Sequence, residues 1–210
     1  MQIELNNEII NVEIIRKNNK NIYFRFKNGN LVVTCNRLVS LKRIQELIKN
    51  NEDSLYKMYL RNNKEMQNDL FFNYLGKKYT IIYDNATKNV YFDNDLVFAK
   101  DDKTLKKFYD KECIRIFENE VNRIVPYFNN IPKFTLKIRK MKTRWGVNNI
   151  TKRNITLNSE LLKKEPHLLD YVIIHELCHF YEANHSARFW KHVSKYYPKY
   201  KEARKELREV

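Results

Sequence analysis

The chain has few of the residues that break or cross-link a fold. Its 210 residues include 3 glycines, 4 prolines and 3 cysteines. The glycines are dispersed, so no Walker-type phosphate-binding loop is present in the sequence. Cys35, Cys113 and Cys178 lie far apart and form no CxxC pair, and an odd number suits a reducing compartment better than a disulfide framework. We therefore expect a cytoplasmic protein.

Long apolar segments are lacking as well. No segment approaches the roughly 18 uninterrupted apolar residues that suggest a membrane helix. The first residues, MQIELNNEIINVEIIRK, contain no basic stretch followed by an apolar run, as a secretory leader would. We expect neither secretion nor a membrane span. The apolar fraction of 43% is nevertheless sufficient to bury a substantial core.

Positive charge is abundant. Lysine and arginine outnumber aspartate and glutamate by 40 to 25, which gives a net charge of +15. Such a charge attracts polyanions, among them RNA, DNA, acidic proteins and anionic lipid. The lysines are scattered through almost every segment, as a compositional drift of a whole proteome would also produce. Nucleic acid is thus a candidate partner, but the charge alone defines no binding site for it.

The first hundred residues read as strands and turns with one helical segment. Strand patterns occur at residues 22–26, 31–35, 70–84 and 88–102. Asn28 and Gly29 separate the first two patterns and tolerate positive φ, which is a strong hairpin signal. Residues 41–60 have apolar side chains at helical spacing, with Ser40 as the cap. No internal repeat is apparent. We expect residues 1–100 to form a β-rich module carrying a helix.

The second half opens with an amphipathic pattern. From Asp102 onward the apolar residues fall on one face of a helix until Pro126 stops it. Residues 133–140 and 154–157 look like strands, and SELLKKEP begins a short helix. These strand and helix patterns predict an α+β fold, with a soft boundary near residue 100 between two packed halves.

The segment YVIIHELCHFYEANHS, residues 171–186, contains three of the five histidines. His175 and His179 are four residues apart, about 400° around a helix, so both imidazoles lie on one face and can share a tetrahedral ion. Glu176 stands beside the first histidine, where a general base can reach a metal-activated water. The alternative is a helix with two ordinary histidines. The apolar YVII before the motif favours a metal site, because it buries the helix and leaves a histidine edge for a cleft.

A zinc ion that activates water needs three protein ligands and an open position. His185 is the leading third ligand. It follows His179 by six residues, so the chain must turn, and Asn184 tolerates the left-handed conformation that ends helices. The spacing equals that of the metzincin pattern H-E-x-x-H-x-x-G-x-x-H, although Glu182 replaces its glycine. The rival third ligands are His192, Glu202 and Glu206.

A second unusual stretch is MKTRWGVNNITKRNITLN, residues 141–158. Arg144, Trp145 and Asn158 are candidates for a wall that binds an extended peptide by strand addition. The alternative is a core tryptophan at a turn, with Asn158 capping the next helix. Cys178 is expected to pack in the core, and His167 to lie at the surface.

Together these residues resemble the YgjP-like family of zinc metallopeptidases, relatives of the SprT-like proteins within the zincin group. The matching segments are MKTRWG (141–146), ITLN (155–158), DYVIIHELCH (170–179), NHSARFW (184–190) and YPKYKEARKEL (197–207). The N-terminal half, with its hairpin, helix and YLGKKY segment (74–79), also looks like the β-rich leader of that family. Relatives commonly have Ser-Cys after Trp-Gly, whereas this chain has Val147 and Asn148.

The resemblance implies a zincin-like catalytic domain at residues 101–210, against which the β-rich module of residues 1–100 packs. In it His175, His179 and His185 match the ligands of one Zn²⁺, and Glu176 matches the catalytic glutamate. We expect a zinc metallopeptidase that hydrolyses a peptide or protein. Two alternatives stay open: a metal-dependent hydrolase of nucleotides or other non-peptide substrates, and a zincin-fold protein that binds nucleic acid.

Overall fold

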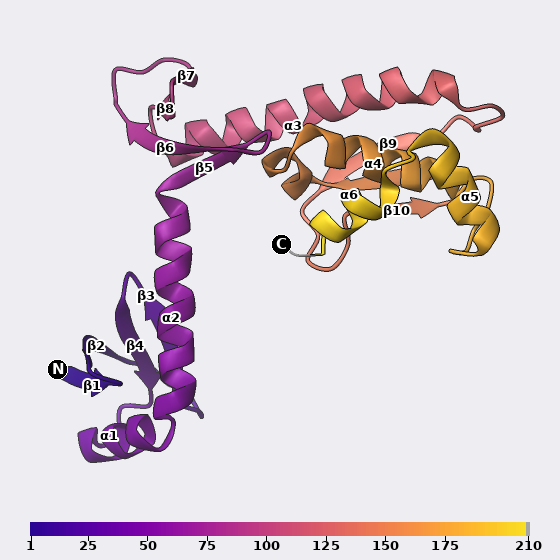
Figure 1. The fold of residues 1–210 in the computed structure, drawn as a ribbon. Coiled ribbons are helices and arrows are strands. Elements are labelled where there is room, and N and C mark those ends of the chain that lie inside the picture. The colour runs from indigo at the N-terminus through magenta and orange to yellow at the C-terminus, as the bar shows by residue number, and fades with distance from the viewer. Residues whose placement is uncertain (209–210) are drawn as a thin grey trace. The chain divides into compact units, whose positions relative to one another are not determined.

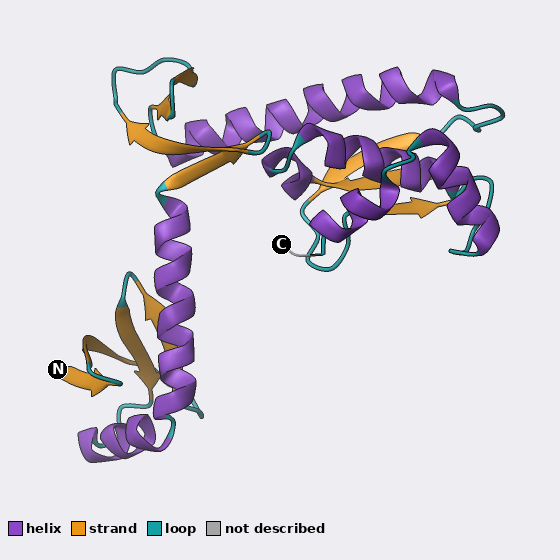
Figure 2. Cartoon of the chain, in the orientation of Figure 1, coloured by secondary structure: helices purple, strands orange, loops and turns teal. Residues whose placement is uncertain are grey.

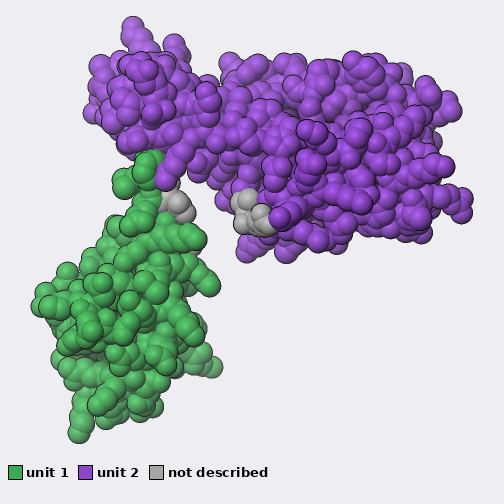
Figure 3. Space-filling model, in the orientation of Figure 1, with its two compact units in different colours: residues 1–71 green, residues 72–210 purple. Residues whose placement is uncertain are grey.

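The computed structural model describes residues 1–208, which mix helices and strands (Figure 2). The contacts between residues divide the chain into two compact units, Met1–Phe71 and Phe72–Val210, here called unit 1 and unit 2 (Figure 3). The α+β class expected from the sequence is confirmed. The proposed division into a module at 1–100 and a catalytic domain at 101–210 stays a prediction.

Unit 1 contains a four-stranded sheet of order β1-β2-β4-β3, followed by two helices. β2 and β4 are parallel, and both outer pairs are antiparallel. The predicted hairpin is confirmed, since Asn28 and Gly29 have φ of 50° and 76° between β3 and β4. The single predicted helix is divided at Asn51, and Ser40 caps its first part by accepting a hydrogen bond from the Arg43 N–H. The elements are β1 (Gln2–Leu5), β2 (Glu8–Arg16), β3 (Tyr23–Lys27), β4 (Asn30–Cys35), α1 (Leu41–Asn50) and α2 (Glu52–Asp69).

The first sheet of unit 2 repeats this topology. Its order is β5-β6-β8-β7, with β6 and β8 parallel and β7 and β8 antiparallel. A capped helix again follows, because the Asp101 carboxylate accepts a hydrogen bond from the Thr104 N–H at 2.7 Å. The elements are β5 (Phe71–Tyr74), β6 (Lys77–Tyr83), β7 (Tyr91–Asp93), β8 (Leu96–Ala99) and α3 (Asp102–Ile124).

The repeated topology corrects the expectation that the chain contains no repeat. The sequence does carry a short trace of it. KNIYF at residues 20–24 leads into β3, and KNVYF at residues 88–92 leads into β7, the equivalent strand of the second sheet. The surrounding residues differ in the two copies, so the shared strand order shows the relation more clearly than the sequence does.

α3 extends from the β5–β8 sheet to the second sheet of unit 2 (Figure 1). As predicted, Pro126 follows its end, within the one-turn helix η1 (Val125–Tyr127). The second sheet has the order β10-β11-β9, in which β11 pairs antiparallel with β10 and parallel with β9. Its strands are β9 (Thr135–Arg139), β10 (Gly146–Asn149) and β11 (Asn154–Asn158).

The remaining helices gather around α4, which lies in the core of unit 2. It contacts α3, α5, α6, β10 and β11, and its buried residues fall on all sides of the helix. The elements are η2 (Ser159–Lys163), α4 (Pro166–Cys178), α5 (Ala187–Tyr196) and α6 (Tyr200–Glu206). Within residues 1–208, no helix has both the length and the apolar character that crossing a bilayer requires.

A hydrogen bond joins Tyr74 on β5 to Glu112 on α3, and Glu112 also forms an ion pair with Arg115 of the same helix. Glu112 lies in the middle of α3, and its carboxylate accepts hydrogen bonds from the Arg115 guanidinium at 2.6 and 2.8 Å and from the Tyr74 hydroxyl at 2.6 Å. The bonds from Arg115 contribute most to lowering the pKa of Glu112, and the bond from Tyr74 adds to them against the opposing effect of burial.

This pair predicts an acid-dependent loss of stability. Because folding lowers the pKa of Glu112, its contribution is complete above the unfolded-state pKa of about 4.3 and disappears as the pH falls through the folded-state value. We expect Glu112→Gln to lower the free energy of unfolding by about 1 kcal/mol at pH 7 and by less at pH 3. Urea unfolding followed by tryptophan fluorescence measures this in unit 2, which holds both tryptophans, Trp145 and Trp190.

The matched control is Glu118→Gln, which removes an exposed carboxylate from the same helix. An equal loss of stability at both pH values in Glu112→Gln would contradict the linkage.

Candidate metal centre

The HELCH motif lies at the end of α4. The helix begins at Glu165 and Pro166, since proline favours the first helical position, and ends at Cys178. His175 and Glu176 therefore occupy its last turn, and His179 follows the last helical residue. We expected the chain to turn between Glu182 and Asn184. The helix ends about one turn before that point, at Cys178.

The reversal after α4 is made of short-range hydrogen bonds. The Glu182 N–H donates to the Cys178 carbonyl at 3.1 Å. The Asn184 side-chain oxygen accepts from the Ser186 N–H at 3.1 Å, and Ser186 in turn caps α5 by accepting from the Phe189 N–H. No residue in the described stretch 179–186 has positive φ. The expected left-handed Asn184 is thus wrong: its amide oxygen, not its backbone conformation, stabilises the turn.

The turn brings the three histidines together. Their ligand atoms lie within 4.8 Å of one another. Nε2 of His175 and Nε2 of His185 are 3.0 Å apart, and the His179 ring centroid is 5.0 and 4.9 Å from those of His175 and His185. Nδ1 of His179 lies 3.1 Å from the Glu182 carbonyl, which can accept its proton and leave Nε2 free as a ligand.

The surroundings favour neutral imidazoles. Burial lowers the pKa of His175 to about 3, with further contributions from His179, His185 and Arg204. The pKa values of His179 and His185 are also lowered, again chiefly by burial. Neutral imidazole is the form that binds a metal ion. Among residues 1–208, Nδ1 of His175 has no hydrogen-bond partner. Three converging neutral nitrogen donors fit a divalent cation.

The rival third ligands have other contacts or lie outside this cluster. The His192 ring lies 5.0 Å from the Tyr181 ring, and Glu206 accepts from His167 at 3.0 Å. Glu202 is not part of the cluster. Cys178 is fully buried, and burial raises the pKa of its thiol to about 12, so it packs in the core as expected.

Glu176 is held in a tight, buried position beside the cluster. Its side chain is 5% exposed, and burial raises its pKa to about 8, opposed by a backbone hydrogen bond at Asn148 and by the charge of Arg144. A methyl group placed on Gly146 would come within 2.5 Å of the Glu176 carboxylate. Gly146 on β10 is therefore needed because Glu176 fills the space that a side chain would take.

Asn148 is a positioning residue that the sequence reasoning missed. Its Nδ2 donates to the Glu176 carbonyl at 2.7 Å. Carbonyls in the last turn of a helix have no partner within the helix, so this bond satisfies one of them and fixes α4 to β10. The sequence pointed to this position only because Val147 and Asn148 replace the Ser-Cys that relatives commonly have after Trp-Gly.

Asn158 organises the loop before β10. Its Nδ2 donates to the carbonyls of Met141 and Arg144 at 2.9 and 2.8 Å, and its Oδ1 accepts from the Met141 N–H. The same oxygen caps η2 through the Glu160 N–H. Trp145, half-buried, donates from Nε1 to the Leu207 carbonyl at 3.1 Å. The predicted cap is confirmed, and the loop that carries Arg144 is fixed by backbone contacts.

Two cavities contain residues of the cluster, and a third adjoins them. One of about 340 Å³ contains His175 and Glu176 together with Trp145, Arg204 and Arg208. A second, of about 470 Å³, contains all three histidines, Glu176 and Arg144. A third, of about 700 Å³, lies on the other side of the Trp145 loop and is lined by lysines. The first and third share Trp145, and the second and third share Arg144.

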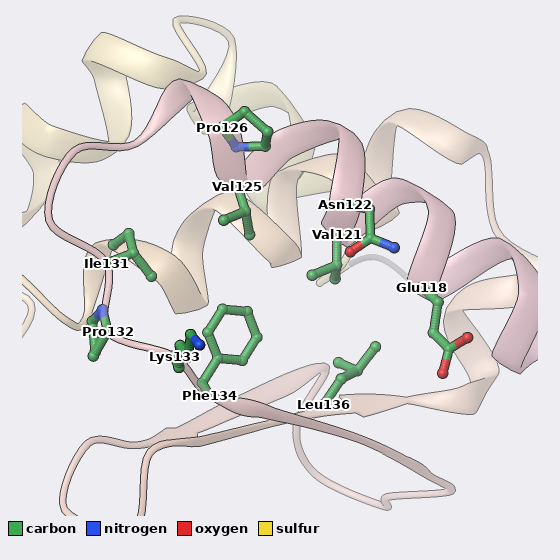
Figure 4. Close-up of a pocket in the computed structure, with 10 residues that line it drawn as sticks. All are labelled: Glu118, Val121, Asn122, Val125, Pro126, Ile131, Pro132, Lys133, Phe134 and Leu136. Atoms are coloured by element: carbon green, nitrogen blue, oxygen red, sulfur yellow. The ribbon is translucent and has the colours of Figure 1, made fainter.

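A further cavity is remote from the histidines. It has a volume of about 680 Å³ and lies between the end of α3 and β9 (Figure 4). Its walls are largely apolar, with Val121, Val125, Phe134 and Leu136 pointing into it. It holds none of the three clustered histidines, so we do not assign chemistry to it.

A sequence profile of the YgjP-like metallopeptidase domain matches residues 20–210. The chain belongs to the YgjP-like metallopeptidase family. Membership supports a metal-dependent peptidase that acts on a peptide or protein, and it implies a divalent metal ion. The resemblance inferred from the HELCH and Trp-Gly segments is confirmed.

Solved structures of two metallopeptidase zymogens show distant similarity to this YgjP-like protein. Jannalysin of Methanocaldococcus jannaschii is 23% identical over 44% of this chain and 94% of its own, with a TM-score of 0.40. Abylysin of Pyrococcus abyssi is 26% identical over 45% and 90%, with a TM-score of 0.37. Similarity at this level supports no conclusion about the present site. No curated protein matches the sequence.

The contact between Gly146 and Glu176 predicts a strong coupling between the two positions. We expect Gly146→Ala to cost about 1–3 kcal/mol of stability, because the added methyl displaces a packed side chain. In a Glu176→Ala background the same change should cost less, since the group it meets is gone. A double-mutant cycle by urea unfolding measures the difference. Equal costs in the two backgrounds would show that Glu176 does not set the requirement for glycine.

Proposed function

We propose that the protein is a zinc peptidase in which His175, His179 and His185 hold one ion and Glu176 is the general base. The observation that carries this is the convergence of three neutral imidazoles beside a buried carboxyl in one cavity. Membership of the metallopeptidase family supports the same reading. We further propose that the part from residue 101 onward is a zincin-like catalytic domain and that the enzyme works in the cytoplasm, as cysteine usage suggests.

Zinc in such a site supplies a Lewis acid that polarises the substrate carbonyl and acidifies a water molecule. Glu176 accepts the proton of the attacking water and transfers it to the leaving nitrogen. Its environment suits both steps, because burial favours the protonated form while Arg144 favours the carboxylate. A pKa of about 8 allows Glu176 to take up and release a proton near neutral pH.

The loop from Met141 to Trp145 is proposed to form one wall of the substrate site. Arg144 and Trp145 line the cavities next to Glu176 and are positioned to contact substrate. Asn158, which we expected beside them as a substrate-binding residue, lines the lysine-rich cavity but uses its side chain to hold the loop backbone. We propose that it acts by positioning Arg144 and Trp145.

The decisive substitution is Glu176→Gln, which keeps the shape and removes the base. We expect peptide hydrolysis to fall by about 10²–10⁴-fold, the usual contribution of a general base, with the zinc content unchanged. Turnover of a peptide library and metal analysis of the same preparations test this. Retained hydrolysis in Glu176→Gln, with Glu118→Gln as the matched carboxylate control, would refute the role of Glu176.

A second substitution tests the third ligand. We expect His185→Ala to weaken zinc binding by more than the roughly 10–100-fold typical of an outer-shell partner, because it removes a direct ligand. Competition with a chromogenic chelator measures the affinity. His192→Ala is the control, since it removes a rival histidine from the following helix. Unchanged zinc affinity in His185→Ala would require a different third ligand.

A further inference from the structure

Cations line the two cavities that contain Glu176 and the neighbouring cavity across the Trp145 loop. Their basic residues are Lys140, Lys142, Arg144, Lys163, Lys164, Arg204 and Arg208. Apart from Glu176, their acidic lining residue is Glu160. Glu160 already forms ion pairs with Lys163 at 2.8 Å and with Lys140 at 3.3 Å. Among the described side chains of residues 1–208, which leave out those of residues 65, 68 and 69, the other five cations form no ion pair with a carboxylate.

Arg204 is held in position beside the histidines. Its guanidinium lies 4.8 Å from the centre of the Trp190 ring, and Tyr200 stacks on the same ring at 5.2 Å. The Trp190 ring is in turn 5.6 Å from that of His185. Arg204 therefore packs on aromatic rings that lie next to His185. This packing restricts the side-chain rotamers that a surface arginine normally samples.

The resulting potential at the centre is positive. Arg204 lines one cavity together with His175 and Glu176, and Arg144 lines another together with the three histidines and Glu176. A divalent ion on the histidines would add two further positive charges. A neutral peptide bond carries no charge that could offset these positive charges. A carboxylate on the substrate would offset them at short range.

We propose that the substrate is an acidic peptide, whose carboxylate side chain next to the scissile bond binds Arg204 and Arg208. This rests on the proposed peptidase function. The cavity of about 340 Å³ that holds both arginines also contains His175 and Glu176, so a side chain bound there lies next to the reacting bond. Lys142, Arg144 and Lys164 bind further acidic residues across the Trp145 loop.

The contacts of Trp145 favour a peptide over nucleic acid. Single-stranded nucleic acid typically stacks its bases on free aromatic faces. Here the Lys164 ammonium lies 5.7 Å from the centre of the Trp145 ring, and Nε1 of Trp145 is bonded to the Leu207 carbonyl. The ring thus forms part of the wall between two cavities. Arg204 and Arg208 line the cavity that contains Glu176, and the lysines line the other.

The test uses the zinc-loaded full chain and a set of peptides that differ only by Glu, Gln, Asp, Asn or Lys at each position flanking the cleaved bond. We expect glutamate or aspartate at one adjoining position to raise kcat/KM by about tenfold over the matching amide, as a charge-assisted contact provides. The double variant Arg204→Gln and Arg208→Gln should lose this preference. Arg204→Lys should keep part of it, because the charge remains.

The control is the double variant Lys137→Gln and Arg139→Gln. It makes the same change in net charge at two exposed positions of β9, outside the three cavities. It should retain the preference for acidic peptides. Zinc content, measured for every variant, should be the same throughout. If the control variant loses the preference for acidic peptides to the same extent, net charge causes the preference, and the proposed role of the arginines is overturned.

Binding separates failure of this inference from failure of the proposed function. Fluorescence anisotropy with the Glu176→Gln protein should show tighter binding of acidic peptides than of their amide counterparts, dependent on Arg204 and Arg208. Peptide cleavage without acidic preference would overturn this inference alone. Absence of both cleavage and peptide binding would overturn both proposals. Arginine-dependent binding of an oligonucleotide that displaces the acidic peptide at lower concentration would assign the cations to nucleic acid instead.

Discussion

Burial of α4 beyond its exposed first residues is the constraint on which the centre depends. A helix with apolar residues on every side fixes the core of unit 2, but its last turn must then carry His175 and Glu176 into a poorly solvated place. Burial keeps the imidazole neutral and raises the pKa of the carboxyl. The same packing that stabilises the domain thus favours the protonation states that the proposed ligand and the proposed base require.

The end of α4 is where this constraint is relieved. Helix carbonyls that lose their partners there are satisfied from outside, by the Asn148 side chain at Glu176 and by the turn hydrogen bonds at Cys178. Ending the helix at Cys178 also frees the chain to reverse, so that Ser186 can begin α5 and His185 can face His175. Without that stop, six further helical residues would carry His185 away from the other two.

Local patterns made much of this predictable. The Asn28-Gly29 hairpin, the stop at Pro126 and the four-residue histidine spacing each depend on neighbours in sequence, and the fold shows each of them. The bond from Asn148 to Glu176 joins residues 28 apart, and the need for Gly146 comes from the Glu176 side chain. Such contacts form only when the sheet and the helix pack together, so neither residue type nor sequence spacing predicts them.

The sequence gives the amount of positive charge, but the places where that charge gathers depend on packing. A net charge of +15 spread along the chain does not define a site, because scattered lysines are compatible with many functions. The cations near Glu176 come from two distant segments, the loop at Met141–Trp145 and the C-terminal helix with Arg204. The hydrogen bond from Trp145 to the Leu207 carbonyl joins these segments. Packing of these distant segments therefore places cations beside Glu176, which the scattered charge of the sequence does not predict.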